Sequence, residues 1–79
     1  MAQINLENIS KIEKHRNTVQ KKAHATTYTV FEMDDKKYVQ IDTYGTIDRK
    51  KPEQVSQTIQ FDKDAAVFLV DILRKEFDL

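Results

Sequence analysis

Residues 26–44 read TTYTVFEMDDKKYVQIDTY, and they contain the clearest secondary-structure signal of the chain. It is rich in Thr, Tyr, Val and Phe, which favour strands, and its second half alternates between apolar and polar residues with the period of a β-strand. The cluster Asp34–Asp35–Lys36 in its middle is typical of a turn. The stretch therefore predicts a β-hairpin, with one strand over 26–33 and the next over 37–44.

Two further elements are predicted after the hairpin. A third strand covers 55–61, and it follows a loop over 45–54 that holds the only Gly, the only Pro and the triplet Arg49–Lys50–Lys51. Asp62 is a suitable N-cap for a helix over 63–76. Apolar side chains cover an arc of about 200° on that helix, which is wider than the stripe that one sheet face needs. We expect the helix to contact the sheet on one side and another helix, from the same chain or from a second copy, on the other.

An N-terminal helix is predicted over 6–22. Asn5 is a suitable N-cap, Glu7 favours the first turn, and Ile4 and Ile9 have the spacing of a hydrophobic staple. Apolar residues fall on one stripe of this helix and basic residues on the opposite side: Ile9, Ile12, Val19 and Ala23 against Lys11, Lys14, Lys21 and Lys22. The predicted fold is α+β: one domain over 1–79 in the order α-β-β-β-α, with an antiparallel three-stranded sheet over 26–61 and helices on one of its faces.

The composition excludes several classes of protein. The chain has 79 residues, no Cys and a net charge of zero from 13 basic and 13 acidic residues. A chain this small buries only about 60% of its unfolded surface, so we expect a homodimer. Zero net charge excludes a global field that would attract polyanions, although residues 1–31 carry +3 and residues 32–79 carry −3. The longest apolar run, over 65–70, is too short for a membrane span, and the absence of a leader favours the cytoplasm.

An enzyme is not expected from these residues. His15 and His24 are nine residues apart, no Cys completes a zinc site, and a single Gly excludes a phosphate-binding loop. Asp34 and Asp35 lack the oxygen spacing of a calcium loop. We therefore predict no cofactor and no metal.

The polar face of the predicted sheet is the candidate site. Tyr38, Gln40, Asp42 and Tyr44 alternate with the apolar Val39 and Ile41 in one strand, and Ser56, Thr58 and Gln60 alternate with Val55, Gln57, Ile59 and Phe61 in the next. Hydroxyls, amides and phenols make directional bonds and stacking contacts at modest entropic cost. The predicted nucleic-acid-binding residues are Tyr38, Gln40, Tyr44, Arg49, Lys50, Lys51, Thr58 and Gln60, and the ligand would be single-stranded or distorted DNA or RNA.

Two alternatives apply to this face. The same groups suit a protein-interaction module, such as a phage or mobile-element factor that inhibits or adapts a host complex. They are also ordinary strand formers without a binding role. The face is expected to be exposed, unless the N-terminal helix covers it and Arg16 pairs with Asp42.

The pattern KYVQIDTYG over 37–45, followed by Arg49, Pro52 and VSQTIQFD over 55–62, resembles a family of short bacterial and phage-borne proteins. The resemblance covers residues 37–73 and implies no particular activity. Strands followed by a C-terminal helix are also loosely similar to the PC4-type coactivator fold, whose members bind single-stranded DNA as dimers. This chain departs from that fold by one strand fewer, an added N-terminal helix and a sheet face poorer in Lys and Arg.

Overall fold

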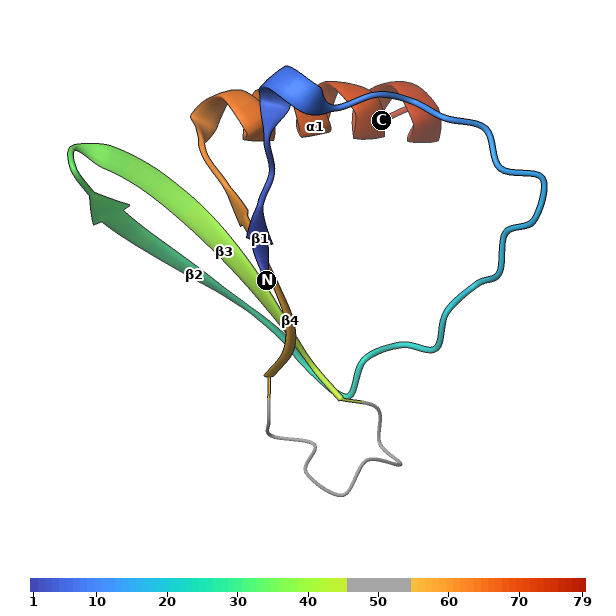
Figure 1. Cartoon of the computed structure of the whole chain (residues 1–79), viewed down its shortest axis with the longest axis horizontal. Coiled ribbons are helices and arrows are strands. Elements are labelled where there is room, and N and C mark those ends of the chain that lie inside the picture. Colours follow the sequence, from blue (N-terminus) through green and yellow to red (C-terminus); the bar gives the residue numbers. More distant parts are fainter. Residues whose placement is uncertain (46–54) are drawn as a thin grey trace.

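The computed structural model describes residues 1–45 and 55–79. In chain order its elements are β1 (Ala2–Gln3), the 3-10 turn η1 (Leu6–Asn8), β2 (Thr26–Met33), β3 (Lys36–Tyr44), β4 (Val55–Phe61) and α1 (Lys63–Phe77). The four strands form one sheet in the order β1-β4-β3-β2, and α1 lies to one side of it (Figure 1). The fold is α+β, as the sequence predicts.

The sheet is mixed, so the prediction of three antiparallel strands was wrong. β2 with β3 and β3 with β4 are antiparallel, but β1 runs parallel to β4 at its other edge. Ala2 lies opposite Ile59 and Gln3 opposite Gln60, and the Ile4 amide donates to the Gln60 carbonyl at 2.9 Å. A strand of two residues carries no period, and the sequence pattern therefore gave no sign of it.

The hairpin turn has the geometry that a two-residue connection requires. Asp34 and Asp35 have φ values of 53° and 64°, and Met33 pairs with Lys36 across the turn. Positive φ at both central residues matches the right-handed twist of the flanking strands, and Asp tolerates this left-handed region better than most residues. The acidic pair therefore fixes the register of the whole hairpin.

A register shift between Thr43 and Tyr44 changes one predicted face. Thr43 pairs with Gln57, but Tyr44 pairs with Val55 rather than with Ser56. An extra residue in one strand reverses the side on which the following residues point. Val55, which we predicted on the apolar face, thus lies opposite Tyr44 and lines a pocket over the polar face.

The N-terminal helix predicted over 6–22 does not form. Asn5 does act as a cap, since its side-chain oxygen accepts from the Glu7 amide at 3.1 Å, but only the single turn η1 follows it. Residues 9–25, here named the arm, contain no helix or strand and run as an extended connection from η1 to β2 (Figure 1). Ile12 and Val19 on its predicted apolar stripe are 67% and 97% exposed. An isolated helix of this length is marginal in water, and no part of the described chain covers the side on which its apolar residues would lie.

The C-terminal helix forms where the sequence predicts it and is capped at both ends. The Asp62 carboxylate accepts from the Ala65 amide at 2.9 Å, and Asp64 lies in the first turn. Asp78 ends the helix in a left-handed conformation with φ 56°, and the Leu79 amide donates to the Arg74 carbonyl. Both caps satisfy backbone groups that a helix end leaves unpaired.

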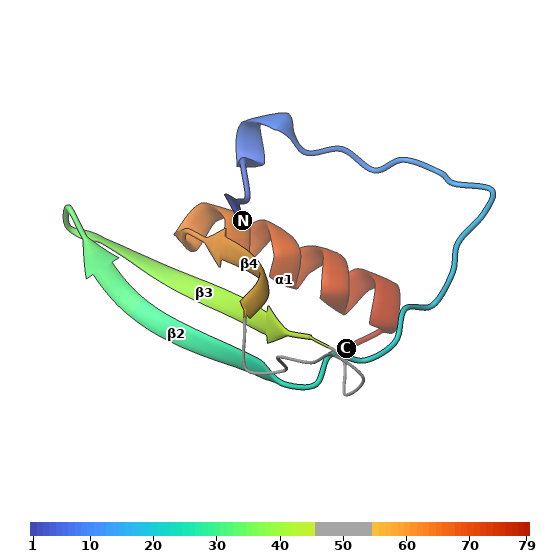
Figure 2. The ribbon, with the colours of Figure 1, turned by 60° about the horizontal axis from the view of Figure 1, so that its bottom comes forward.

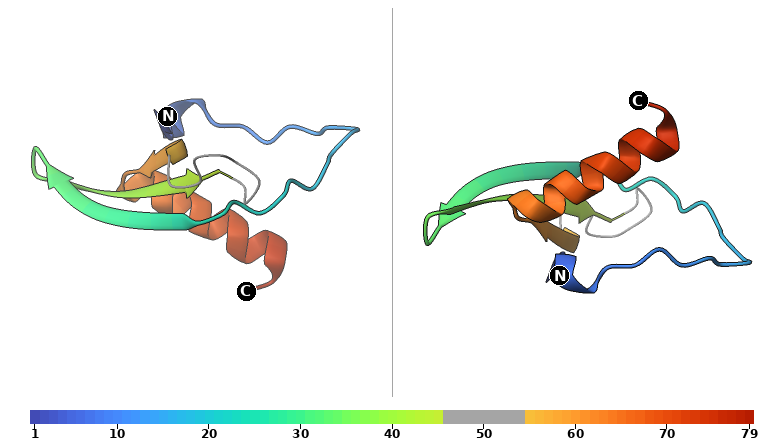
Figure 3. Two further views of the ribbon diagram at one scale, coloured as in Figure 1. Left: turned by 90° about the horizontal axis from the view of Figure 1, so that it is seen from below. Right: turned by 90° about the horizontal axis from the view of Figure 1, so that it is seen from above.

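α1 contacts the rest of the molecule mainly near its start. Ala65 is 1% exposed, and it is the one apolar residue of the described chain that is buried. α1 contacts β4 and η1 (Figure 2). In both views of Figure 3 the C-terminal half of α1 extends past β2. Leu73 and Phe77 in this half are 40% and 69% exposed. The second side of the wide apolar arc therefore has no partner helix in the part of the chain that the structure describes.

The chain exposes more surface than a compact protein of its mass. Its accessible surface is 7598 Å², whereas a folded monomer of 9.3 kDa exposes about 5,000 Å². The radius of gyration is 14.8 Å, against about 12 Å for a compact domain of this length. The extended arm and the open apolar sides of α1 and β2 both contribute to this excess.

Candidate nucleic-acid interface

Four polar side chains on β3 and β4 form one hydrogen-bonded group. The Thr58 hydroxyl donates to the Asp42 carboxylate at 2.6 Å, and the Gln40 amide donates to both Asp42 oxygens at 3.0 and 3.2 Å. The Gln60 amide in turn donates to the Gln40 side-chain oxygen at 2.8 Å. The register produces this arrangement, because Gln40 pairs with Gln60 and Asp42 with Thr58. We name Gln40, Asp42, Thr58 and Gln60 the polar layer.

Asp42 is the centre of the polar layer. The Thr58 hydroxyl and then the Gln40 amide lower the pKa of its carboxyl below the ordinary value, and partial burial opposes them. The side chain is 8% exposed, yet its bonds come from neutral donors. The layer therefore holds a negative charge, and the Gln40 amide and the Thr58 hydroxyl stabilise that charge through hydrogen bonds.

The two tyrosines of the polar face lie on either side of the polar layer along β3. The Tyr38 ring stacks on Phe31 of β2, with centroids 5.4 Å apart and planes at 23°. The Tyr44 hydroxyl lies 3.3 Å from the Thr27 hydroxyl, also on β2. Both rings are half-buried and supported from the neighbouring strand, which presents them as rigid surfaces.

The end of the arm is tied to the sheet beside Tyr44. The His24 amide donates to the Gly45 carbonyl at 2.7 Å, and the Tyr44 amide donates to the Ala25 carbonyl at 2.9 Å. These backbone bonds continue the pairing of β2 with β3 beyond Thr26. They also fix where Lys21, close to the end of the arm, lies beside the sheet.

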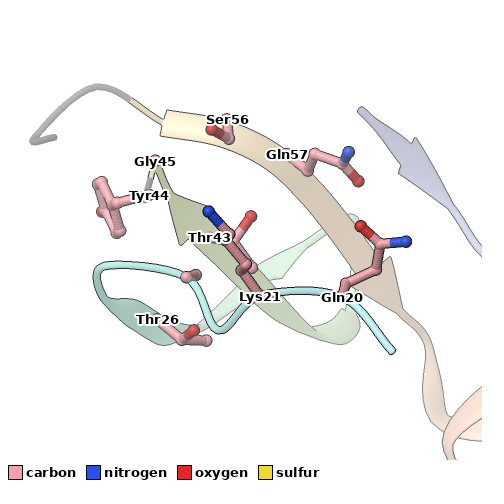
Figure 4. Close-up of a pocket in the computed structure, with 9 residues that line it drawn as sticks. Gln20, Lys21, Thr26, Thr43, Tyr44, Gly45, Ser56 and Gln57 are labelled. Carbon is pink, nitrogen blue, oxygen red and sulfur yellow. The ribbon is translucent and has the colours of Figure 1, made fainter. Parts of the chain in front are cut away.

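A pocket of about 720 Å³ opens where the arm meets the ends of β3 and β4. In the view of Figure 4, Lys21 lies between the Tyr44 ring on one side and the amides of Gln20 and Gln57 on the other. We name this the end pocket, and its lining is Gln20, Lys21, Ala23, Thr26, Thr43, Tyr44, Gly45, Ser56 and Gln57. It combines one cation, amide and hydroxyl groups and one aromatic ring.

The arm carries half of the basic residues of the described chain and only one of its acidic residues. It has five basic residues and one acidic residue, a net charge of +4, and nearly all of it is exposed. The other described residues, 1–8, 26–45 and 55–79, hold five basic and ten acidic residues, a net charge of −5. A neutral chain thus has a basic arm joined to an acidic body.

The structure separates the predicted site residues into three groups. Gln40, Thr58 and Gln60 belong to the polar layer; Tyr38 lies beyond it near the hairpin turn, and Tyr44 lies in the end pocket. Arg49, Lys50 and Lys51 lie outside the described residues. A second pocket of about 510 Å³ lies over the polar layer, next to Met1–Gln3. Neither an N-terminal helix nor a bond between Arg16 and Asp42 occupies this face in the described chain.

Of the residues that line the end pocket, the predicted site includes Tyr44 but omits the cation, Lys21, and the two side-chain amides, Gln20 and Gln57. Lys21 was recognised only as part of a basic stripe on a helix. Gln57 was placed on the apolar face, where strand alternation does put it, opposite Thr43. Gln57 shares its strand face with the apolar Ile59 and Phe61. This polar residue on an apolar face was the signal in the sequence that the face becomes polar at one end.

Residues 1–45 and 55–79 hold no group of three or more His, Cys, Asp or Glu side chains arranged to bind a metal ion. No helix in these ranges is long and apolar enough to cross a membrane.

Comparisons with known proteins returned nothing similar: no family model matches the chain, and neither a curated protein nor a solved structure does.

Proposed function

We propose that this protein is a non-enzymatic, cytoplasmic module that binds single-stranded or locally distorted nucleic acid at the end pocket and along the arm. The observation that carries the proposal is the position of Lys21 in one pocket with Tyr44 and two side-chain amides. A lysine neutralises a phosphate, and an aromatic ring stacks on any base that is free of a duplex. The basic arm then provides further phosphate contacts.

The polar layer has a different role in this proposal. The Asp42 carboxylate would repel a phosphate, and the Gln40 amide and Thr58 hydroxyl already donate to it. These two residues position β3 and β4 rather than contact the ligand. Tyr38 borders the layer, and Gln60 is the member of the layer that donates to Gln40. These two side chains would contact bases of a strand that extends from the end pocket across the sheet.

The triplet Arg49–Lys50–Lys51 is included in the proposal on its sequence. It begins four residues after Gly45, which lines the end pocket, and is therefore close to that pocket in sequence. Its positive charge would add to that of the arm.

The test is a fluorescence anisotropy titration with a labelled single strand, the matching duplex and a single-stranded RNA. We expect the single strands to bind more tightly than the duplex. We also expect affinity to fall with salt, with a log–log slope of about 0.7 for each phosphate contacted. Lys21→Ala with Lys22→Ala should weaken binding and reduce that slope, and so should alanine at Arg49, Lys50 and Lys51. No binding of any strand at low salt would contradict the proposal.

A matched control is present at the other end of the sheet. Lys36 and Lys37 are exposed at the hairpin turn, far along β3 from Tyr44. Lys36→Ala with Lys37→Ala removes the same charge as the Lys21 and Lys22 pair, so a general electrostatic effect would appear equally in both. Only the Lys21 and Lys22 pair should change affinity for the single strand.

A protein-interaction module of phage or mobile-element type is the second candidate, and the uncovered apolar surface favours it. Val70, Leu73 and Phe77 on α1 are each at least 40% exposed, as an interface with a host protein would require. In that case Tyr38→Ala or Tyr44→Ala should harm function more than loss of the basic triplet.

We further propose that the module acts as a homodimer. The support is the excess of accessible surface, since 7598 Å² exceeds the value for a compact monomer by more than the roughly 800 Å² per partner that a stable interface buries. Sedimentation at micromolar concentration tests this. A single 9.3 kDa species would contradict it.

A further inference from the structure

β2 is an open edge of the sheet. Among the described strands only β3 pairs with it. In an antiparallel pair, alternate residues bond to the neighbouring strand and the others direct their N–H and C=O groups away from it. The bond from the Tyr44 amide to the Ala25 carbonyl and the closing pair Met33–Lys36 set this alternation. The outward backbone groups are therefore those of Thr26, Tyr28, Val30 and Glu32.

This edge lacks the features that usually prevent pairing with another chain. Exposed edges are commonly short, interrupted by Pro or a bulge, or protected by Lys. β2 has eight residues, TTYTVFEM, with no Lys, Pro or Gly and with Glu32 as its single charge. Its eight residues pair with β3 in unbroken register. The opposite edge, β1, has only two residues.

Apolar side chains accompany the outward backbone groups. Tyr28 and Val30 are 76% and 52% exposed, and alternation places them on the same face as Val39 and Ile41. The C-terminal half of α1 extends past β2 in both views of Figure 3. A strand added to this edge would thus bury apolar surface as well as satisfy backbone groups.

We propose that β2 pairs with β2 of a second copy, antiparallel about a two-fold axis at Thr29, so that two four-stranded sheets become one. This inference rests on the homodimer of the proposed function and names its contact; it does not depend on nucleic-acid binding. With the axis at Thr29, residues 26–32 of one copy pair along their whole length with residues 26–32 of the other copy. This register sets Tyr28 opposite the partner's Val30, which is a favourable aromatic and β-branched pair. Glu32 then lies opposite the partner's Thr26, and no like charges meet.

A single cysteine tests the register directly, because the chain has none of its own. In the proposed dimer Thr29 faces the partner's Thr29 in a non-hydrogen-bonded pair, where Cα atoms are about 4.5 Å apart. That separation lies within the range of a disulfide. Thr29→Cys should therefore form a covalent dimer under mild oxidation, seen on a non-reducing gel.

Thr27→Cys is the matched control on the same strand and face. In the proposed register Thr27 lies opposite the partner's Phe31, and the two Thr27 positions are four residues apart, about 13 Å. It should stay a monomer on the gel at the same protein and oxidant concentration. Equal linking of both variants, or linking of Thr27→Cys alone, would overturn the proposed pairing even if sedimentation shows a dimer.

Val30→Pro provides an independent measurement. Its N–H points away from β3, so proline removes a bond to the partner and none within the chain. Sedimentation should change from dimer to monomer while the circular dichroism spectrum is retained. A dimer that persists with this variant contradicts the inference; if the variant does not fold, the two cysteine variants decide. A wild-type monomer would overturn both the homodimer and its edge contact, whereas loss of only nucleic-acid binding would overturn neither.

Discussion

The arm and α1 begin with similar sequence signals and end as different structures. Asn5 is a good N-cap just before η1 and the arm, and Asp62 is a good N-cap before α1. Each cap accepts a backbone hydrogen bond. Both segments have apolar residues at helical spacing. The cap is followed by a single 3-10 turn in one case and by a 15-residue helix in the other.

The difference lies in what the two segments can bury. α1 has nine apolar residues in fifteen. Only Asp62 separates it from β4, so the chain places the helix against the sheet. The arm has five apolar residues in seventeen and a net charge of +4. Most helical stability in proteins comes from tertiary packing rather than from propensity. A cap and a periodic apolar stripe therefore predict a helix only where a surface for it to pack against is close in the chain.

Replacing one valine by proline in each segment should give the largest difference in unfolding free energy. Val70→Pro breaks the interior of α1 and should cost about 3 kcal/mol or more of unfolding free energy. Val19, which is 97% exposed in the arm, should accept proline with a change of at most about 0.5 kcal/mol. Urea denaturation followed by circular dichroism measures both. Similar losses in the two variants would show that the arm is helical in solution.

The sheet that supports α1 should lose stability in acid through Asp42. Its pKa is lowered in the folded chain, so the unfolded chain binds the proton first as the pH falls. The stabilising contribution is complete above the ordinary Asp pKa of about 3.9 and is lost as the pH falls through the lower folded value. Urea midpoints between pH 7 and pH 2 measure it. Asp42→Asn should be less stable at pH 7 and should flatten this part of the profile; an unchanged acid profile would contradict the polar layer as the cause.

Raising helix propensity in the arm should have the smallest effect. Asn17→Ala with Thr18→Ala adds up to about 1 kcal/mol of intrinsic preference, but it supplies no surface for the arm to pack against. The helical signal at 222 nm should stay that of α1 alone. A clear increase would mean that propensity, and not packing, limits the helix over 6–22.

The sequence was sufficient to predict the strands and the helix whose apolar residues repeat with the period of that element. β2, β4 and the Asp62 cap lie where we predicted them, β3 begins one residue earlier, and α1 ends one residue later. The turn was predicted from the polar cluster Asp34–Asp35–Lys36, and the structure shows positive φ at both aspartates. Each of these signals is local, which is why a single sequence contains it.

The remaining features depend on contacts between distant residues. β1 is two residues long and exists through its pairing with Ile59 and Gln60. The shift at Thr43–Tyr44 moved Val55 to the other face, and no local pattern specifies it. For the site, alternation correctly grouped Gln40, Thr58 and Gln60, but it could not show that they bond to Asp42 and to one another. Nor could it bring Lys21 to Tyr44, because the arm was taken for a helix.

The most direct test of the proposed binding site is an amide chemical-shift titration of the full chain with an unlabelled single strand at low salt. We predict that the largest changes fall on Gln20, Lys21, Tyr44, Gly45 and Gln57, with smaller changes along the arm. Amides of α1 and of the hairpin turn at Asp34–Lys36 should stay unchanged. Changes confined to α1, or no changes at any strand concentration, would contradict a nucleic-acid site where the arm meets the sheet.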